Sequence, residues 1–425
     1  MEHRHNTVSL HSAIDDALVA IPPGRPVWVA LSGGLDSCLL LTLAVQAARR
    51  HPHPIYALHV NHGLQAAAAD FERRCRVLCD RLGVPLYVER VRVDRQGRGM
   101  EAAAREARYA AFAQRVGVGD TLWLAQHADD QAETLLLAAL RGSGVRGLAG
   151  MPAQRAWAGR YLVRPLLAFT RAELEREAKA LGVVWADDPS NEDVAISRNY
   201  LRHDIIPRLA ARWPEAPLSL ARSATLASEA DALLDDLAAL DLEMAGGNAD
   251  RLALDHIVSL SPSRQRLLIR YACQRLGLPT PPASRLATLL EQLSAREDAR
   301  VNVDWVGGEA RRWRGALYLQ APRVALPANW HADWTGQPGL QTPAGPVEVS
   351  LVPSDARPCR LRLTWRKGGE ALRVAGRGRR DVKRLLQEAG IPPWQRDRQL
   401  LAWDGDTLVA VLGVAVAEGW EMVAG

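Results

Sequence analysis

Short apolar runs alternate with amphipathic stretches between residues 27 and 167 of the chain. The runs are rich in Val, Leu, Ile and aromatic residues, which strands favour, and they occupy residues 27–31, 55–60, 85–93, 121–125 and 161–167. The stretches between them have the apolar spacing of amphipathic helices. Strands that alternate with helices predict a parallel sheet covered by helices, so we expect an α/β fold for this part of the chain.

The pattern changes beyond residue 212. A helical stretch rich in Ala, Leu, Asp and Arg comes first, and a later segment dense in Pro and Gly, with weak periodicity, is typical of a linker. We therefore predict four parts: an α/β domain over residues 1–212, a mostly helical domain over 213–325, a linker over 326–348 and a small α+β domain over 349–425.

The composition is that of a folded protein with several domains. A length of 425 residues exceeds one compact domain, and a content of 48% hydrophobic and 24% charged residues excludes a disordered chain. The five cysteines form no dense, even framework, and the N-terminal segment lacks the apolar core of a signal peptide. No apolar run reaches the length that spans a bilayer. We therefore expect a cytoplasmic protein with no membrane partner.

The basic residues are unevenly distributed. The net charge is +5, from 53 basic and 48 acidic residues, and nearly all of the basic residues are arginines. Residues 355–400 contain 13 basic and 5 acidic residues, whereas the rest of the chain has a slight acidic excess. A codon bias toward arginine would not concentrate it in one place, so this segment predicts contacts with RNA phosphates. The residues concerned are Arg373, Arg377, Arg379, Arg380, Lys383 and Arg384.

The first apolar run leads directly into a glycine-rich segment, Ser32-Gly33-Gly34-Leu35-Asp36-Ser37, which a helical pattern follows. A glycine-rich turn between a strand and a helix leaves backbone N–H groups free at the helix N-terminus, where they bind phosphate. The segment is neither a Walker A loop nor a G-x-G-x-x-G loop, and its acidic Asp36 indicates a phosphate bridged by Mg²⁺. A plain turn capped by Ser37 would account for one glycine and one serine, but not for the whole string.

This segment resembles the pyrophosphate loop, S-G-G-x-D-S, of the N-type ATP pyrophosphatases, or PP-loop superfamily. Members of that superfamily split ATP between its α and β phosphates and adenylate an acceptor, which a nucleophile then attacks. The resemblance implies that the N-terminal domain has the PP-loop fold and that ATP and Mg²⁺ are its cofactors. It does not indicate the acceptor.

Further polar motifs narrow the choice of acceptor. In chain order they are HVNHGL at 59–64, REARY at 105–109, AQHADDQAET at 125–134, RGSG at 141–144, and DPSN at 188–191 with Arg198-Asn199 and Arg202 beyond it. Singly, each has an ordinary explanation. The carboxylates of the third motif could favour a helix N-terminus, its His127 could be a capping or core histidine, and the arginines of the last motif could form a solvated face. Together, and in this order, the motifs resemble the tRNA(Ile)-lysidine synthetase family.

This resemblance implies a ligase that joins free L-lysine to C2 of the wobble cytidine of tRNA(Ile) with a CAU anticodon, through an adenylated tRNA. ATP would be converted to AMP and pyrophosphate. The basic C-terminal segment is similar to the tRNA-binding domain that ends longer members of the family, so tRNA(Ile) and L-lysine are the expected partners. We expect Trp365 and Trp394 in that segment to pack in its core rather than stack on bases. Dimerisation is a family-level expectation for some members.

The resemblance also assigns roles to individual residues. The nucleotide-binding residues would be Ser32, Gly33, Gly34, Leu35, Asp36, Ser37 and His62, with Asp36 as the Mg²⁺ ligand. The catalytic residues would be Asp36, Arg105, His127 and Asp130, while Asp129, Glu133, Arg198 and Arg202 would contact the substrates or tRNA. The lysine amine arrives protonated, so a carboxylate near C2 must take a proton, and Asp130 is our candidate. Arg105, Arg198 and Arg202 would clamp anionic groups of the nucleotide or substrate.

Two other functions are less well supported by the residues. A tRNA thiolase of the same superfamily needs an active-site cysteine, but Cys75 and Cys79 lie outside the motifs, and Cys38 has the pattern of a buried helix residue. An RNA-binding protein with a vestigial ATP site would lack the polar residues of the loop, which are all present. Gln126 stands where many relatives have a histidine, so we assign it no role.

Overall fold

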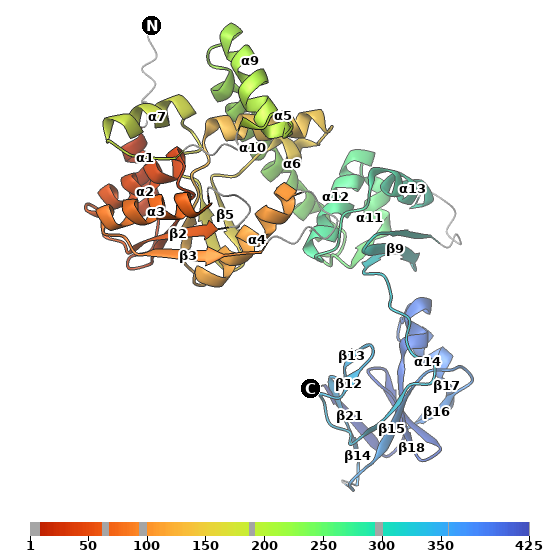
Figure 1. Cartoon of the computed structure of the whole chain (residues 1–425). Helices are drawn as coiled ribbons and strands as arrows, with labels where there is room; N and C mark the ends of the chain where they lie inside the picture. The colour runs from red at the N-terminus through yellow and green to blue at the C-terminus, as the bar shows by residue number, and fades with distance from the viewer. Residues whose placement is uncertain are drawn as a thin grey trace. The chain divides into compact units, whose positions relative to one another are not determined.

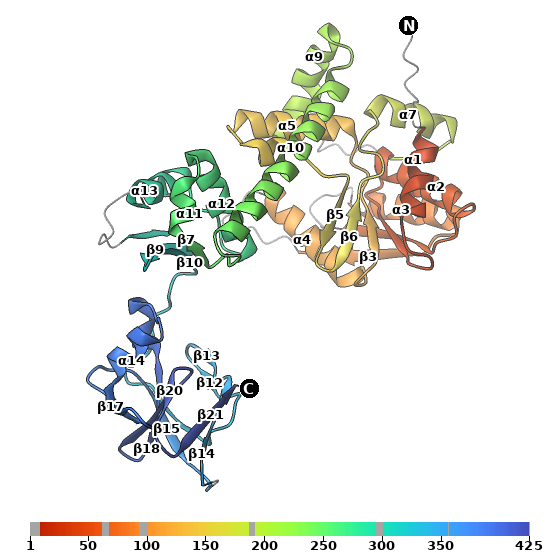
Figure 2. The ribbon, with the colours of Figure 1, turned by 180° about the vertical axis from the view of Figure 1, so that it is seen from behind.

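The computed structural model describes residues 9–61, 68–92, 100–186, 192–293, 301–355 and 357–424. The chain divides into two compact units, Met1–Asp236 and Leu237–Gly425, and Figures 1 and 2 show the ribbon from opposite sides. None of the helices in the described ranges combines the length and the apolar character needed to cross a membrane.

The first unit is built on one sheet whose strands follow the order β3-β2-β1-β4-β6-β5. Their bounds are β1 Val27–Ala30, β2 Ile55–Asn61, β3 Leu86–Arg90, β4 Thr121–Trp123, β5 Gln154–Trp157 and β6 Arg160–Val163. The pairs β1–β2, β2–β3, β1–β4 and β4–β6 are parallel, and β5 pairs antiparallel to β6. The predicted parallel α/β sheet is therefore confirmed. The prediction missed β5, because this edge strand is exposed and contains no apolar run.

Helices cover both faces of this sheet (Figure 1). The helices of the first unit are α1 Leu10–Val19, α2 Leu35–Ala48, α3 Ala68–Leu82, α4 Met100–Arg115, α5 Ala128–Leu140, α6 Val145–Leu148, α7 Arg171–Ala180, α8 Ser197–Tyr200, the π-turn η2 Leu201–Ile205, α9 Ile206–Arg212 and most of α10 Ala216–Met244. One core includes Leu39 and Leu41 of α2, together with residues of α1, α3 and α7. The core on the other face includes Trp28 and Phe112, which join β1 to α4.

The second unit begins with helices that pack on a small antiparallel sheet. The helices are α11 Leu254–Ser259, α12 Pro262–Arg275 and α13 Ala283–Leu293, and the sheet has the order β7-β10-β9-β8, with bounds Arg251–Ala253, Ala316–Gln320, Gly308–Trp313 and Asn302–Trp305. Leucines of α12 and α13 share one core with the sheet. The helical middle part predicted from the sequence is present, but its core is closed by strands.

The C-terminal part of the second unit is mainly antiparallel sheet. Its main sheet has the order β11-β15-β18-β19-β20, with bounds His331–Trp334, Leu361–Trp365, Leu400–Asp404, Thr407–Val411 and Ala415–Val416. Shorter pairs are β12 Gln341–Thr342 with β13 Gly345–Pro346, β14 Val349–Pro353 with β21 Trp420–Ala424, and β16 Ala371–Val374 with β17 Gly378–Asp381, beside the helix α14 Val382–Glu388 and the 3₁₀ turn η3 Pro393–Arg398. This agrees with the predicted α+β class.

The segment predicted as a linker, residues 326–348, is part of that C-terminal fold. Its strand β11 pairs with β15, and Trp334, which is 3% exposed, lies in the same core as Val347. The prolines and glycines that indicated a linker belong to short strands and the turns between them. The linker prediction therefore needs correction, because strands this short leave no periodic pattern in the sequence.

Candidate active site

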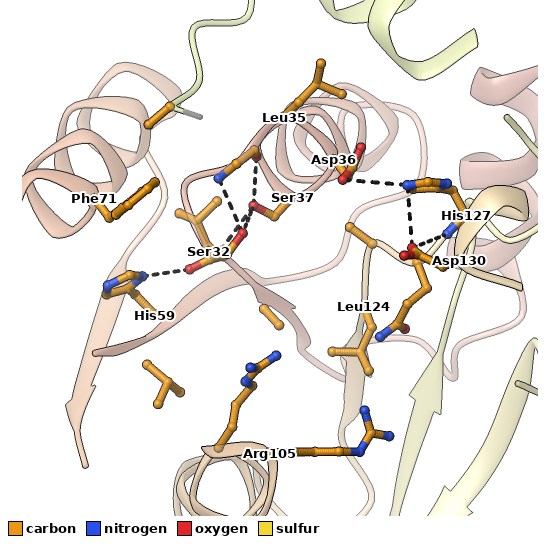
Figure 3. Close-up of a pocket in the computed structure, with 18 of the residues that line it drawn as sticks. Ser32, Leu35, Asp36, Ser37, His59, Phe71, Arg105, Leu124, His127 and Asp130 are labelled. Carbon is orange, nitrogen blue, oxygen red and sulfur yellow. Dashed lines mark hydrogen bonds and ion pairs between the residues drawn. The ribbon is translucent and has the colours of Figure 1, made fainter. Parts of the chain in front are cut away.

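A cavity of about 860 Å³ opens where β1, β2 and β4 end. The strand order reverses at β1, since β2 lies on one side of it and β4 on the other. Open parallel sheets bind ligands at such a point, beyond the carboxyl ends of the strands. The 32–37 loop, the face of α4 and the N-terminal end of α5 line the cavity (Figure 3). The N-terminal end of α7 and residues of α8 and η2 complete the lining.

The glycine-rich loop is closed by its two serines. Ser37 is buried, and its hydroxyl donates to the Gly34 carbonyl at 3.0 Å and accepts from the Ser32 N–H at 3.1 Å. The Ser32 hydroxyl accepts from the Gly34 N–H at 3.3 Å. Because α2 begins at Leu35 with Gly34 as its N-cap, the loop lies at a helix N-terminus, as predicted. This is the geometry in which backbone N–H groups bind phosphate.

Gly33 is a position that only glycine suits. Its φ is +92°, in a region that side chains make unfavourable. A Cβ there would lie 3.2 Å from Phe71 Cδ1 and 3.4 Å from Cys75 Sγ on α3. The glycine therefore allows α3 to pack directly behind the loop.

A histidine surrounded by carboxylates lies beside the loop. His127 is 2% exposed; its Nε2 is 3.8 Å from Asp36 Oδ2 and 3.5 Å from Asp130 Oδ2, and its Nδ1 is 3.4 Å from Asp129 Oδ2. It is also the N-cap of α5, and its backbone N–H donates to Asp130 at 3.1 Å. The structure thus brings together four side chains that the sequence motifs singled out, from segments that follow two different strands. Figure 3 shows Asp36, His127 and Asp130 among them.

Burial and the neighbouring charges shift the pKa of each of these groups in opposite directions. Burial by itself would lower the pKa of His127, but the neighbouring carboxylates, Asp130 first, raise it above its ordinary value. Burial acts to raise the pKa of Asp130, but the charges of His127 and of two arginines outweigh this and lower it. Burial raises the pKa of Asp36, and the charges of His127 and Arg171 offset this only in part. The cluster therefore favours an ionised Asp130 beside a charged histidine.

Arg198 and Arg202 surround a fully buried carboxylate. Glu133, which is 0% exposed, accepts from Arg198 Nε at 2.5 Å and from Arg202 Nε at 2.7 Å. The same guanidinium groups reach Asp130 Oδ1 at 3.2 and 3.0 Å. Both arginines, at the junction of α8 and η2, are thus paired with carboxylates of α5. Their role as anion clamps stays a prediction.

Arg171 was not among the residues singled out from the sequence. It is the first residue of α7, and its Nη1 donates to both carboxylate oxygens of Asp36 at 2.7 Å. Its backbone N–H donates to Asp129 at 2.8 Å. The capping box of Thr170 and Glu173 indicates a helix start at this point of the sequence. No local pattern indicates a pairing with a residue 135 positions away.

The remaining predicted residues lie elsewhere. Arg105 lies on α4, across the cavity from the loop, with its Cζ 4.9 Å from the ring centre of Tyr109 (Figure 3). His62 and the DPSN motif at 188–191 lie outside the described residues. The basic cluster is in the second unit, on β16, β17, α14 and the turn between the strands. There Arg377 and Arg384 pair with Glu388.

Two tryptophans of the second unit pack against other aromatic side chains, and three cysteines of the first unit are buried. Trp365 is buried against Trp330, as expected. Trp394 is half-buried and packs near Trp313 and Tyr318 of the β7-β10-β9-β8 sheet rather than in the core of the C-terminal part, so that expectation needs correction for Trp394. The cysteines Cys38, Cys75 and Cys79 are buried, and burial raises the pKa of the Cys38 and Cys79 thiols to about 12 and that of Cys75 further still. A thiolate nucleophile is therefore disfavoured here.

The residues present fit Mg²⁺ only together with a phosphate ligand. Within the described ranges, no group of three or more His, Cys, Asp or Glu side chains is arranged to hold a metal ion. Mg²⁺ is commonly bound by one or two carboxylates plus substrate phosphates and water. Asp36, at the start of α2, is placed to be such a carboxylate beside the phosphate loop.

Three family models match successive parts of the chain. The PP-loop domain model matches residues 6–209, the TilS substrate binding domain model residues 252–318, and the TilS substrate C-terminal domain model residues 361–424. The tRNA(Ile)-lysidine synthase of Pseudomonas putida KT2440 is 44% identical over 402 residues, which are 91% of this chain and 92% of the relative. The chain belongs to the tRNA(Ile)-lysidine synthase family.

A second relative supports this family assignment, whereas the similarity to solved structures is low. The tRNA(Ile)-lysidine synthase of Pseudomonas aeruginosa PAO1 is also 44% identical, over 93% of this chain and 92% of the relative. Among solved structures, the U34-tRNA thiolase NcsA of Methanococcus maripaludis is 17% identical, with a TM-score of 0.44 over 52% of this chain and 78% of its own. That similarity is too low to bear on function. The resemblance that the motifs indicated is thus confirmed at the level of the family.

A second buried carboxylate holds the rim of the cavity together. Glu72 of α3 accepts from Asn61 Nδ2 at 3.1 Å, from Arg76 at 2.8 Å and from Arg90 at 3.2 Å. It thereby joins α3 to the ends of β2 and β3, and Asn61 lines the cavity. The hydrogen bond from Arg76 lowers the pKa of Glu72, burial opposes this, and Asn61 adds to the lowering.

We predict that Glu72→Gln destabilises the protein near neutral pH by about 1 kcal/mol, a modest value because both arginines are well exposed. A carboxylate whose pKa is lowered by folding stabilises the folded state above its unfolded pKa, and this contribution is lost as pH falls through the folded pKa. The difference between wild type and variant should therefore shrink below about pH 4.5. Urea unfolding at several pH values measures it. Asp70→Asn, which removes two exposed pairs on the same helix, is the control; a difference that does not depend on pH would contradict the prediction.

Proposed function

We propose that this protein joins free L-lysine to C2 of the wobble cytidine of tRNA(Ile) with a CAU anticodon, forming lysidine and converting ATP to AMP and pyrophosphate. The observation that carries the proposal is the juxtaposition of the loop at 32–37 with the Asp36–His127–Asp130 cluster, in a chain 44% identical to tRNA(Ile)-lysidine synthases. Phosphate-binding N–H groups and ionisable side chains meet in one cavity. Activation by ATP and attack by an amine need both.

The first step uses the loop. The C2 oxygen of cytosine is a poor leaving group, and transfer of AMP to it makes a good one. The N–H groups at the start of α2 would hold the phosphates, with Gly33 allowing the close approach of the backbone. Bound by Asp36 and by phosphate oxygens, Mg²⁺ would offset the charge of the departing pyrophosphate.

The second step uses the carboxylates. The ε-amine of lysine is positively charged at neutral pH, and Asp130 is held ionised by its lowered pKa. Asp130 would hold the incoming ammonium and take a proton from it, which frees the nitrogen lone pair to attack C2. AMP would leave from C2 as the C–N bond forms. His127, in contact with Asp130 and Asp36, would keep both carboxylates in place.

The reaction is tested with unmodified tRNA(Ile) carrying a CAU anticodon, ATP and labelled lysine. We expect label in the tRNA, with one AMP released for each lysine incorporated. Omission of ATP is the first control, and the methionine tRNA with the same CAU anticodon is the second. Sulfur incorporation without lysine would indicate a thiolase, and tRNA binding without ATP turnover would indicate an RNA-binding protein.

Asp130→Asn should lower the rate of lysine transfer by about 100-fold or more, because the amide neither holds the ammonium by charge nor accepts its proton. Adenylation, followed as exchange between pyrophosphate and ATP, should decline less. Asp80→Asn, on the exposed side of α3, is the matched control. Wild-type rates of lysine transfer in Asp130→Asn and Asp130→Ala would refute the role of Asp130.

We infer that the basic cluster of the C-terminal part contacts tRNA phosphates. Arg379 and Lys383 are exposed on β17 and α14. Deleting the segment from residue 345 would divide the core that contains Trp334, so point variants are the sharper test. Replacing exposed basic side chains by glutamine removes their charge without dividing that core.

In the Arg379→Gln/Lys383→Gln double variant, tRNA affinity should fall about tenfold. The slope of log affinity against log salt should become shallower by up to about two, since each phosphate contact releases about one counterion. Filter binding over a range of salt concentrations measures both quantities. Arg49→Gln, an exposed arginine of the first unit, is the control. An unchanged affinity and slope would place the tRNA contacts elsewhere.

A further inference from the structure

The carboxylate proposed to bind Mg²⁺ is already occupied by a cation of the protein. Both oxygens of Asp36 accept from Arg171 Nη1 at 2.7 Å. A metal ion bound by both oxygens would compete with this guanidinium for the same lone pairs, and the two cations would repel each other. Metal binding by Asp36 is therefore favoured if Arg171 moves away from it.

The backbone of Arg171 is rigidly held. Its N–H donates to Asp129 at 2.8 Å, and the carbonyl of Phe169, two residues earlier, accepts from the Ala128 N–H at 2.8 Å. Thr170 donates through its backbone to Glu173 at 2.7 Å in the capping box of α7. These bonds fix the start of α7 against the start of α5. The side chain therefore has a fixed origin beside the loop.

The guanidinium end of the Arg171 side chain, however, is partly open to solvent. The Arg171 side chain is 41% exposed and that of Asp36 is 25% exposed, and both line the cavity. In contrast, Arg198 and Arg202 hold a carboxylate that solvent does not reach. An ion pair at the cavity surface exchanges partners at little cost, because water and salt already screen it. A buried pair does not, because separation leaves a charge without a partner.

The charge of the cluster indicates what Arg171 does there. Asp36, Asp129 and Asp130 lie around His127. Asp130 also has the arginines of α8 and η2 beside it, whereas Asp36 is paired with Arg171. Loss of Arg171 would therefore leave Asp36 less compensated and more attractive to a divalent cation. Guanidinium groups bind phosphate oxygens as well as carboxylates, through the same planar arrangement of donors. A nucleotide triphosphate would thus offer Arg171 a new partner at the moment when it frees Asp36.

We propose that Arg171 is a positioning residue that holds Asp36 while no nucleotide is bound and exchanges it for phosphate oxygens when ATP and Mg²⁺ enter. The inference rests on the proposed role of Asp36 in metal binding. Its consequence is a coupling between the two ligands: the metal binds weakly alone and tightly with ATP. Arg171 thereby keeps the cavity from filling with metal ions before the nucleotide arrives.

The coupling is measured with Mn²⁺ as the probe, by electron paramagnetic resonance of the full-length protein without nucleotide. In Arg171→Met, which removes the charge and keeps an unbranched side chain, we expect Mn²⁺ alone to bind about tenfold more tightly or better. ATP in the absence of metal should bind about tenfold more weakly. Arg171→Lys, which restores the charge without the planar donors, should bring Mn²⁺ affinity back toward that of wild type.

The controls separate this inference from the proposed function. Arg176→Met changes an exposed arginine of the same helix and should leave both affinities unchanged. Asp36→Asn should weaken Mn²⁺ binding in the presence of ATP; if it does not, the proposed metal role of Asp36 fails, and this inference with it. If Asp36→Asn weakens Mn²⁺ binding but Arg171→Met leaves Mn²⁺ affinity at the wild-type value, only the role of Arg171 is overturned. A loss of Mn²⁺ binding in both Arg171→Met and Arg171→Lys, with a lowered melting temperature, would show a structural pair and overturn the inference.

Discussion

Carboxylates that leave water need cations close by, and this constraint organises the side of the first unit that contains the cavity. Glu133 is the strictest case, because solvent does not reach it. An uncompensated charge in such a place would cost several kcal/mol, about 3–5 kcal/mol by analogy with broken buried pairs. Arg198 and Arg202 supply the compensation and, in doing so, hold α8 and η2 against α5. The wall of the cavity is thus held by a charge requirement as much as by apolar packing.

At the surface of the cavity, carboxylates also have cations beside them, but both partners are partly exposed to solvent. Asp36 has Arg171 and His127 as its cationic neighbours, and burial still raises its pKa. Asp130 lies between His127 and the two arginines of the buried pair, so it feels both environments and stays ionised. The ion pairs therefore differ in exposure between the protein interior and the loop: the carboxylate of Glu133 is fully buried, whereas the pair of Asp36 with Arg171 is partly exposed.

The phosphate loop depends on a different requirement, which is that no side chain fills the space beside its backbone. Backbone N–H groups bind phosphate only if no side chain intervenes, and Gly33 also lets α3 pack behind the loop. Ser32 and Ser37 close the loop through their own hydrogen bonds. Ser37 is not a cap of α2, because Gly34 is the N-cap and makes no side-chain cap hydrogen bond; the Ser37 hydroxyl instead bonds to the backbone of Ser32 and Gly34 and so shapes the loop. Local structure and function use the same residues here.

The sequence by itself determined what depends on local spacing and on direct succession along the chain. Apolar runs predicted the parallel strands, and the 32–37 string, which lies between β1 and α2, predicted the phosphate loop at a helix N-terminus. The order of the motifs predicted the family. Short or exposed strands, such as β5 and β11, left no apolar run, and the linker prediction went wrong for that reason. The pairing of Arg171 with Asp36 and of Arg198 with Glu133 was decided only by the tertiary structure, because residues 135 and 65 positions apart meet only when the sheet brings its strand ends together.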